Sequence, residues 1–184
     1  MKKYIYLLAL LSFIIIGCSD HSNVVAPVGT NDNEPNWIAA ANTLEPLKKD
    51  ITVNKTIYGD QESLLEINTG YPGGIGWISI TANAKFQRYS FTGSLNATMT
   101  INDQFGTADF TPSETFSKPV IYNLTIVGLD LRNVDPSKVR FVYMAPDGNY
   151  YQPQYDRLYV EIQSGKLQII NALLPHFSRY GFVN

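Results

Sequence analysis

Three adjacent residues near the end of the chain, His176, Phe177 and Ser178, have the side chains that a self-cleavage reaction would use. The hydroxyl of Ser178 could attack the carbonyl carbon of Phe177 while His176 accepts the proton, and water would then hydrolyse the resulting ester. The reaction also needs a strained peptide and a donor to the oxyanion, which a sequence does not display. The alternative is that His176 and Ser178 hydrogen-bond the end of a loop while Phe177 and Tyr180 fill the core. Because buried polar groups usually serve such bonding, we expect no catalytic residue and keep self-cleavage as the alternative.

A second group of residues has the chemistry of a binding surface. It consists of four tyrosines with two glutamines between them: Tyr150, Tyr151, Tyr155 and Tyr159, with Gln152 and Gln154. A tyrosine ring has an apolar body and a polar tip, so aromatic faces with amide partners can stack against a sugar or a peptide. The same tyrosines could instead pack across neighbouring strands of a hairpin. Both interpretations stay open, and the four tyrosines are the candidate ligand-binding residues.

The composition does not favour metal or nucleic-acid chemistry. The chain has 184 residues, two histidines, one cysteine and a formal net charge of −2. A zinc site needs three or four nitrogen or sulfur ligands, and the aspartates form no recognisable calcium loop. No basic stripe is present that would bind a nucleic-acid backbone. We therefore predict no metal, no cofactor and no nucleic-acid partner.

The elements that would position these residues have the pattern of β-strands. From about Ile51, short runs rich in β-branched and aromatic residues are separated by Gly, Pro, Asn and Asp, which is typical of strands and turns. The predicted strands are Ile51–Ile57, Ser63–Ile67, Trp77–Thr81, Arg88–Phe91, Asn96–Ile101, Val120–Val127, Val139–Met144, Arg157–Ile162, Leu167–Ile170 and Arg179–Val183. Asp147-Gly148 predicts a hairpin. Many short strands without a long helical period predict an all-β fold, an antiparallel β-sandwich.

The opening of the chain predicts where the domain is delivered. Lys2 and Lys3 precede an almost unbroken apolar run from Tyr4 to Ile16, and Gly17 supplies a small residue. This is the pattern of a secretory signal peptide. The run is shorter than the roughly 20 residues that a membrane-spanning helix needs, so export is favoured over a permanent transmembrane anchor.

The quartet Ile15-Ile16-Gly17-Cys18 resembles the lipobox of bacterial lipoproteins. The resemblance implies that the thiol of Cys18 receives a diacylglyceryl group and that the signal is cut before Cys18, whose new N-terminus is acylated. Several acyl chains would anchor the protein lastingly, since each buried CH₂ contributes about 0.8 kcal/mol and one chain binds only marginally. Ser19, where Asp would hold a lipoprotein at the inner membrane, favours the outer membrane. The expected organisation is a signal peptide over 1–17, a lipidated N-terminus and linker over 18–46, and a β-sandwich domain over 47–184.

The last part of the chain resembles the end of the ZU-type β-sandwich, which is found in zonula occludens proteins, ankyrins and netrin receptors. The resemblance rests on a strand followed by His176-Phe177-Ser178-Arg179-Tyr180, with looser similarity over Trp77–Ala84, Phe116–Leu131 and Val139–Gly148. The usual Pro-Pro-Gly-Ala corner of the family is absent. The resemblance implies a sandwich fold and, because His-Phe-Ser marks self-cleavage in some relatives, a cleavage point between Phe177 and Ser178.

Together these features predict a membrane-anchored bacterial envelope lipoprotein that acts as a non-enzymatic interaction or scaffold module. The expected partners are the membrane, through the lipid on Cys18, and an envelope protein or a glycan. The alternatives are a self-cleaving domain and a glycan-binding module that uses the face of Tyr150 to Tyr159.

Overall fold

The computed structural model describes residues 35–38, 50–73, 76–102, 104–145, 147 and 149–184. All of them belong to one compact unit, Asn33–Asn184. Cys18 and the expected signal peptide lie outside the described residues. Within the described ranges, no helix has the length and apolar character to cross a membrane.

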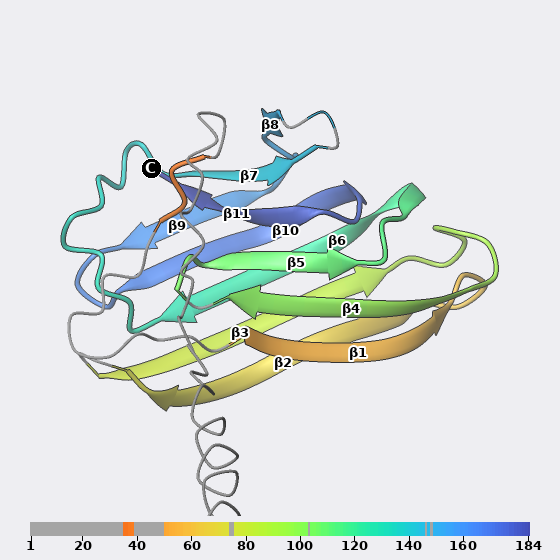
Figure 1. Ribbon diagram of the computed structural model, residues 1–184, viewed down its shortest axis with the longest axis horizontal. Coiled ribbons are helices and arrows are strands. Elements are labelled where there is room, and N and C mark those ends of the chain that lie inside the picture. Colours follow the sequence, from red (N-terminus) through yellow and green to blue (C-terminus); the bar gives the residue numbers. More distant parts are fainter. Residues whose placement is uncertain (1–34, 39–49, 74–75, 103, 146, 148) are drawn as a thin grey trace, which may run out of the picture. The chain divides into compact units, whose positions relative to one another are not determined.

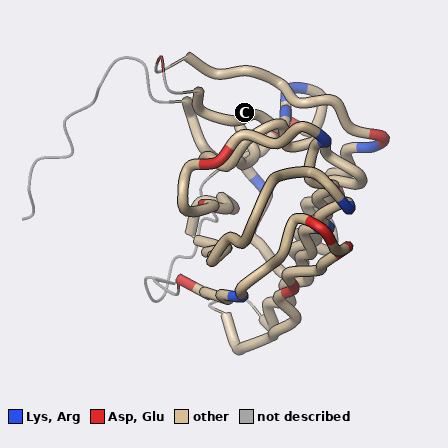
Figure 2. Tube along the Cα trace, turned by 90° about the vertical axis from the view of Figure 1, so that its right-hand side faces the viewer, with Lys and Arg blue, Asp and Glu red and all other residues tan. Residues whose placement is uncertain are grey.

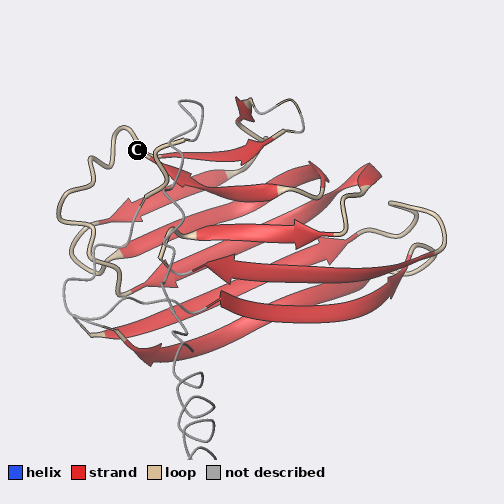
Figure 3. Ribbon diagram, viewed as in Figure 1, coloured by secondary structure: helices blue, strands red, loops and turns tan. Residues whose placement is uncertain are grey.

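The described part of the chain consists of strands and loops (Figure 3). The strands are β1 (Asp50–Tyr58), β2 (Ser63–Pro72), β3 (Trp77–Phe86), β4 (Ser94–Asn102), β5 (Thr107–Thr111), β6 (Thr115–Val127), β7 (Arg140–Met144), β8 (Tyr150–Tyr151), β9 (Arg157–Glu161), β10 (Lys166–His176) and β11 (Arg179–Val183). Each paired set of strands is antiparallel. The all-β, antiparallel prediction is therefore confirmed.

The strands form two sheets that pack face to face, as the predicted β-sandwich requires. Sheet A has the order β1-β4-β5-β11-β7-β8, and sheet B has the order β2-β3-β6-β10-β9. In Figure 1, sheet A lies in front of sheet B. The consecutive strands β1 and β2 occupy corresponding edges of the two sheets, and so do β8 and β9 at the other side. The loop 152–156 therefore carries the chain from sheet A to sheet B.

The core lies between the sheets because alternate residues of each strand point inward. In β6 the inward residues Tyr122, Leu124 and Ile126 are fully buried. Aromatic rings from both sheets meet there: the ring centroids of Phe110 and Tyr122 are 5.2 Å apart, at an interplanar angle of 88°. Such edge-to-face pairs contribute about 0.5–1.5 kcal/mol beyond the area that they bury, so the aromatic cluster helps to fix one sheet upon the other.

One predicted strand is absent from the structure, and the strands β5 and β8 have no counterpart among the predicted ones. Arg88–Phe91 was expected to be a strand, but these residues form turns. Tyr89 has a φ of 64°, a left-handed backbone conformation that a bulky residue rarely adopts and that interrupts an extended chain. Conversely, β5 lacks a sequence prediction because it is short and contains Ala108 and Asp109, residue types that are depleted in strands.

Residues 35–38 lie within the range that the sequence assigns to the linker, and the structure places them against β11. Trp37 forms a β-bridge with Val183, and the backbone N–H of Ile38 donates to the carbonyl of Phe182 at 2.8 Å. The indole of Trp37 lies close to the backbone at Gly181. A Cβ at this position would come within 2.9 Å of the ring, so glycine makes the close contact possible. Ile38 itself is buried in the core.

Candidate functional site

A groove of about 780 Å³ lies beside the loop that connects the two sheets. It is lined by the loop residues Gln152 to Asp156 and by three residues of sheet B: Ile121, Asn171 and Leu173. Ile121 and Leu173 are direct neighbours in the β6–β10 pairing. A volume of this size falls within the range of about 300–1,000 Å³ that is common for ligand pockets.

Backbone hydrogen bonds hold the loop against β10. The N–H of Leu173 donates to the carbonyl of Gln154 at 2.8 Å, and the N–H of Asp156 donates to the carbonyl of Ile170 at 3.0 Å. Within the loop, Nε2 of Gln152 donates to the hydroxyl of Tyr155 at 3.0 Å. The glutamine and tyrosine side chains are therefore placed by the sheet, which makes the groove a preformed feature of the fold.

A β-bulge in β10 turns Asn171 toward this groove. Ile169 pairs with Leu124 and Ala172 pairs with Tyr122, so two residues of β10 stand opposite one residue of β6. Asn171 has a φ of 54°, and asparagine is one of the few residues other than glycine that tolerate this conformation. Bulges are over-represented next to functional sites because they change the direction of a side chain.

Asn171 joins Asp156 to a chain of hydrogen-bonded asparagines across sheet B. Its Nδ2 donates to the carboxylate of Asp156 at 2.7 Å, and its backbone N–H donates to Oδ1 of Asn123 at 2.9 Å. Nδ2 of Asn123 in turn donates to Oδ1 of Asn83 at 3.0 Å. These hydrogen bonds fix the side-chain directions, and a ligand that binds here does not have to order them.

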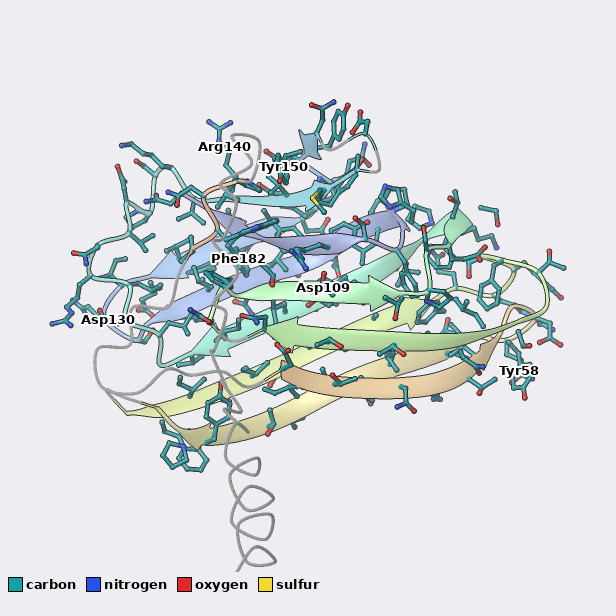
Figure 4. The ribbon with its side chains drawn as sticks, in the orientation of Figure 1. Tyr58, Asp109, Asp130, Arg140, Tyr150 and Phe182 are labelled. Carbon is teal, nitrogen blue, oxygen red and sulfur yellow. The ribbon has the colours of Figure 1, made fainter. Side chains whose placement is uncertain are left out.

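The four candidate tyrosines do not form one face. Tyr155 lines the groove, whereas Tyr150 and Tyr151 belong to β8 in sheet A and Tyr159 belongs to β9 in sheet B. Tyr150 meets the ring of Trp37 edge-on at 6.0 Å, and Figure 4 shows it near the edge of sheet A. Tyr159 is 50% exposed, with the ammonium of Lys166 at 5.6 Å from its ring centroid.

Tyr151 belongs to the β7–β8 hairpin at the predicted Asp147-Gly148 turn. Its ring packs against Tyr143 with the centroids 5.8 Å apart, and its hydroxyl donates to Asp147 at 3.0 Å. Hydrogen bonds from Asn149 hold the pKa of Asp147 below its usual range. The Asp147 carboxylate raises the pKa of the Tyr151 hydroxyl, first through their hydrogen bond. This pair thus stabilises the turn of the hairpin.

The residues of the possible self-cleavage reaction lie at the junction of β10 and β11. The hydroxyl of Ser178 donates to the carbonyl of Met144, and within the described part of the chain no hydrogen bond joins it to the ring of His176. Nδ1 of His176 lies 3.3 Å from the carbonyl oxygen of Phe177. The Phe177 ring is buried and stacks on Phe110 at 5.2 Å. The imidazole is therefore close to the oxygen of the bond in question, while the hydroxyl is engaged elsewhere.

A metal site is not formed by the described residues: no group of three or more His, Cys, Asp or Glu side chains among them could hold an ion. The polar atoms that line the groove belong to amides, a phenol and a carboxylate. Such atoms form hydrogen bonds with hydroxyl and amide groups of a ligand. The groove therefore offers hydrogen-bond donors and acceptors to a ligand.

No protein-family model, no curated protein and no solved structure matches this chain. Its functional residues are therefore inferred from its own fold. Sequence reasoning named Tyr155, Gln152 and Gln154, but it did not find Asn171 or Asn123. The only trace of the bulge in the sequence is the interruption of the apolar alternation at Ile169-Ile170-Asn171. The partners of Asn171 come from strands distant in the sequence, which a local pattern does not reveal.

Proposed function

We propose that this chain is a lipid-anchored protein of the bacterial cell envelope and that its sandwich acts as a non-enzymatic interaction module. The anchor is inferred from Lys2-Lys3, the apolar run that follows and Ile15-Ile16-Gly17-Cys18, and Ser19 favours the outer membrane. The ZU-type resemblance of the tail is part of the proposal, and the arrangement of two antiparallel sheets is compatible with it.

The observation that carries the binding role is the groove beside loop 152–156. It is built from hydrogen-bonding side chains whose positions are fixed by other protein atoms, as in the Gln152–Tyr155 and Asn171–Asp156 pairs. A preorganised set of amide, phenol and carboxylate groups around the apolar residues Ile121 and Leu173 has the composition of a recognition site. The interaction role follows from this combination of an anchor with a prepared surface.

The anchor is tested by feeding cells an alkyne-bearing fatty acid and labelling the purified protein. We expect label in the wild-type chain and none in Cys18→Ser, with the wild type in the membrane fraction. A wild-type product that takes up no label and is recovered in the soluble fraction would contradict the anchor. An immunoblot of the wild type and of Cys18→Ser shows whether the two proteins are expressed at the same level and full length.

The binding role is tested by placing a photoreactive amino acid at Gln154 in the groove and, as the control, at Thr52 on the exposed outer side of sheet A. Irradiation of intact cells should give a discrete crosslinked product from position 154 and none from position 52. Equal products from both positions, or none from either, would remove the groove as the site of interaction.

Self-cleavage between Phe177 and Ser178 is the second candidate function, and one distance favours it. A proton on Nδ1 of His176, 3.3 Å from the Phe177 oxygen, would stabilise negative charge as it develops on that oxygen. The Ser178 hydroxyl would first have to leave the Met144 carbonyl. Intact-mass measurement of the wild type and Ser178→Ala separates this candidate from the interaction module.

A further inference from the structure

The outer side of sheet B presents polar side chains in register across the strands. One row runs through Asn68, Thr81, Thr125, Gln168 and Tyr159. The next row pairs Glu66 with Asn83 and Asn83 with Asn123, and Asn171 reaches Asn123 through the bulge. We call the central part of these rows the amide face; its members are Thr81, Asn83, Asn123, Thr125, Gln168 and Asn171.

The side chains of the amide face are fixed, yet they keep hydrogen-bonding capacity. Nε2 of Gln168 donates to the hydroxyl of Thr125 at 2.9 Å, and Nδ2 of Asn123 donates to Asn83 at 3.0 Å. Among the described residues, no hydrogen bond uses Oε1 of Gln168 or Nδ2 of Asn83, so an acceptor and a donor face outward. A ligand with many hydroxyl groups can use both kinds of atom.

Two exposed aromatic rings lie on the same side of sheet B as the amide face, one on β3 and one on β9. Trp77 on β3 is 63% exposed and Tyr159 on β9 is 50% exposed. Trp77 has the same parity along its strand as Thr81 and Asn83, and therefore points to the same side of the sheet. Position 70 on β2 is glycine, and a Cβ there would come within 2.5 Å of the indole Nε1. The glycine lets the indole lie close against the backbone of β2.

The charges on this side of sheet B do not favour an anionic ligand. All six members of the amide face are uncharged. The same side of sheet B also carries charged residues of both signs, which are Glu66, Lys85, Lys166, Arg157 and Glu161, and Figure 2 shows that charged residues are dispersed along the described trace. Charged residues make up 16% of the chain, against about 25% in typical soluble domains. A nucleic acid or an anionic glycan would require a concentration of cations. An added peptide strand requires an unpaired sheet edge, whereas β3, β6 and β10 are paired on both sides.

We propose that the amide face binds an uncharged polysaccharide chain, which lies across the strands between Trp77 and Tyr159. Sugar rings would stack on the two aromatic side chains, and their hydroxyls would bond to Gln168, Thr125 and Thr81. Tyr159 lies in the row of Thr81, four residues along β3 from Trp77, so the two rings are separated by about 14 Å along the strands and by three interstrand steps, or about 14 Å, across them. A ligand that touches both rings is therefore an extended chain that runs obliquely over the strands. The proposal rests on the proposed binding function and names a ligand class for the same side of the domain.

The experiment is affinity electrophoresis of the full-length protein, purified in a non-ionic detergent, through native gels that contain one polysaccharide each. The neutral probes are hydroxyethyl cellulose, galactomannan and dextran, and polygalacturonate is the anionic comparison. We expect at least one neutral probe to retard the wild type and polygalacturonate to have no effect. Trp77→Ala and Tyr159→Ala should each weaken the retardation by at least about tenfold, since exposed aromatic anchors dominate such contacts.

The matched controls are Tyr58→Ala, which removes an aromatic ring that is 51% exposed in sheet A, and Thr100→Ala, which removes a hydroxyl of the outer side of sheet A. Both should bind like the wild type.

The proposal would be overturned if no neutral probe retards the protein, if polygalacturonate alone retards it, or if the control variants lose as much retardation as Trp77→Ala and Tyr159→Ala. Dimers that light scattering detects in the wild type and not in Trp77→Ala would overturn it in favour of a second copy. A specific crosslink from Gln154 without retardation by any polysaccharide would refute the polysaccharide as the ligand and leave the proposed interaction role in place.

Discussion

The hydroxyl of Tyr180 donates a hydrogen bond to the carbonyl oxygen of His176 across 2.6 Å. It thereby ties β11 back to the end of β10, on the other side of the short turn that contains Phe177 and Ser178. Burial raises the pKa of Tyr180, so the hydroxyl remains a donor under ordinary conditions. The hydroxyl of Tyr122, also buried, has no partner among the described residues, and burial raises its pKa as well.

This contrast predicts opposite effects of the same chemical change. Tyr122→Phe should raise the free energy of unfolding by about 1 kcal/mol, because it removes a buried hydroxyl that lacks a hydrogen bond. Tyr180→Phe should lower it by about 1 kcal/mol, because the His176 carbonyl loses its donor. Urea denaturation of the two variants and the wild type measures both values. A loss of stability in Tyr122→Phe would instead indicate a buried water that bonds to this hydroxyl.

Ser178→Ala should give an uncleaved product, as the wild type does, that differs in mass only by the oxygen atom that the substitution removes. It should cost about 1 kcal/mol of stability, since it removes a hydroxyl that donates to the Met144 carbonyl. Ser117→Ala is the control, because that hydroxyl also donates to backbone carbonyls, those of Tyr89 and Ser90. Intact-mass measurement under denaturing conditions should give one uncleaved product for the wild type and both variants. Release of residues 178–184 from the wild type and not from Ser178→Ala would establish self-cleavage.

The bulge at Asn171 predicts an unusual order of stability among substitutions. Asn171→Gly introduces a residue that adopts a positive φ freely, whereas Asn171→Ala introduces a residue whose Cβ disfavours a positive φ. Asn171→Ala should therefore be less stable than Asn171→Gly by about 1 kcal/mol, although alanine is usually preferred over glycine in a strand. Thermal unfolding of both variants measures the difference. The reverse order would mean that the bulge relaxes when the asparagine is removed.

The ion pair between Asp130 and Arg132 predicts a loss of stability in acid. Arg132 donates from Nε to Oδ1 of Asp130 at 2.8 Å and from Nη2 to Oδ2 at 2.5 Å, and these hydrogen bonds hold the pKa of Asp130 below its usual range. Because the folded-state pKa of Asp130 is lowered, the ion pair's contribution to the free energy of unfolding is fully present above the unfolded-state pKa of about 3.9. It is lost as the pH falls through the folded-state pKa.

The stability of Arg132→Gln should therefore differ from that of the wild type more at pH 7 than at pH 2.5. Arg140→Gln, an exposed control, should show no such pH dependence, and urea unfolding at the two pH values measures both.

Local pattern predicted most of the sandwich but not its irregular positions. The strand predicted from Leu167 ends at Ile170, because Asn171 and Pro175 are typical of turns, whereas β10 continues to His176. The register around the bulge maintains the strand through hydrogen bonds to loop 152–156 and to β6. The converse case is Arg88–Phe91, which has the aromatic residues of a strand but forms a turn because Tyr89 adopts a positive φ.

The candidate site was predictable only where its residues are adjacent in the sequence. Gln152, Gln154 and Tyr155 lie in one short stretch, and the structure places them around one groove. Asn171 and Asn123 are separated by 48 residues, and Asn123 and Asn83 by 40. Only the pairing of β3, β6 and β10 brings them together, and register of this kind is set by the whole fold rather than by a local pattern.

The pairing of Trp37 with Val183 has a mechanical consequence. A pull on the chain upstream of Pro35 is transmitted first to the few hydrogen bonds between residues 36–38 and the end of β11. β11 lies between β5 and β7, so the segment can detach while β11 stays paired on both sides, and its detachment withdraws the buried side chain of Ile38 from the core. Tension of this kind would therefore release residues 36–38 first and leave the strand pairing of the two sheets intact.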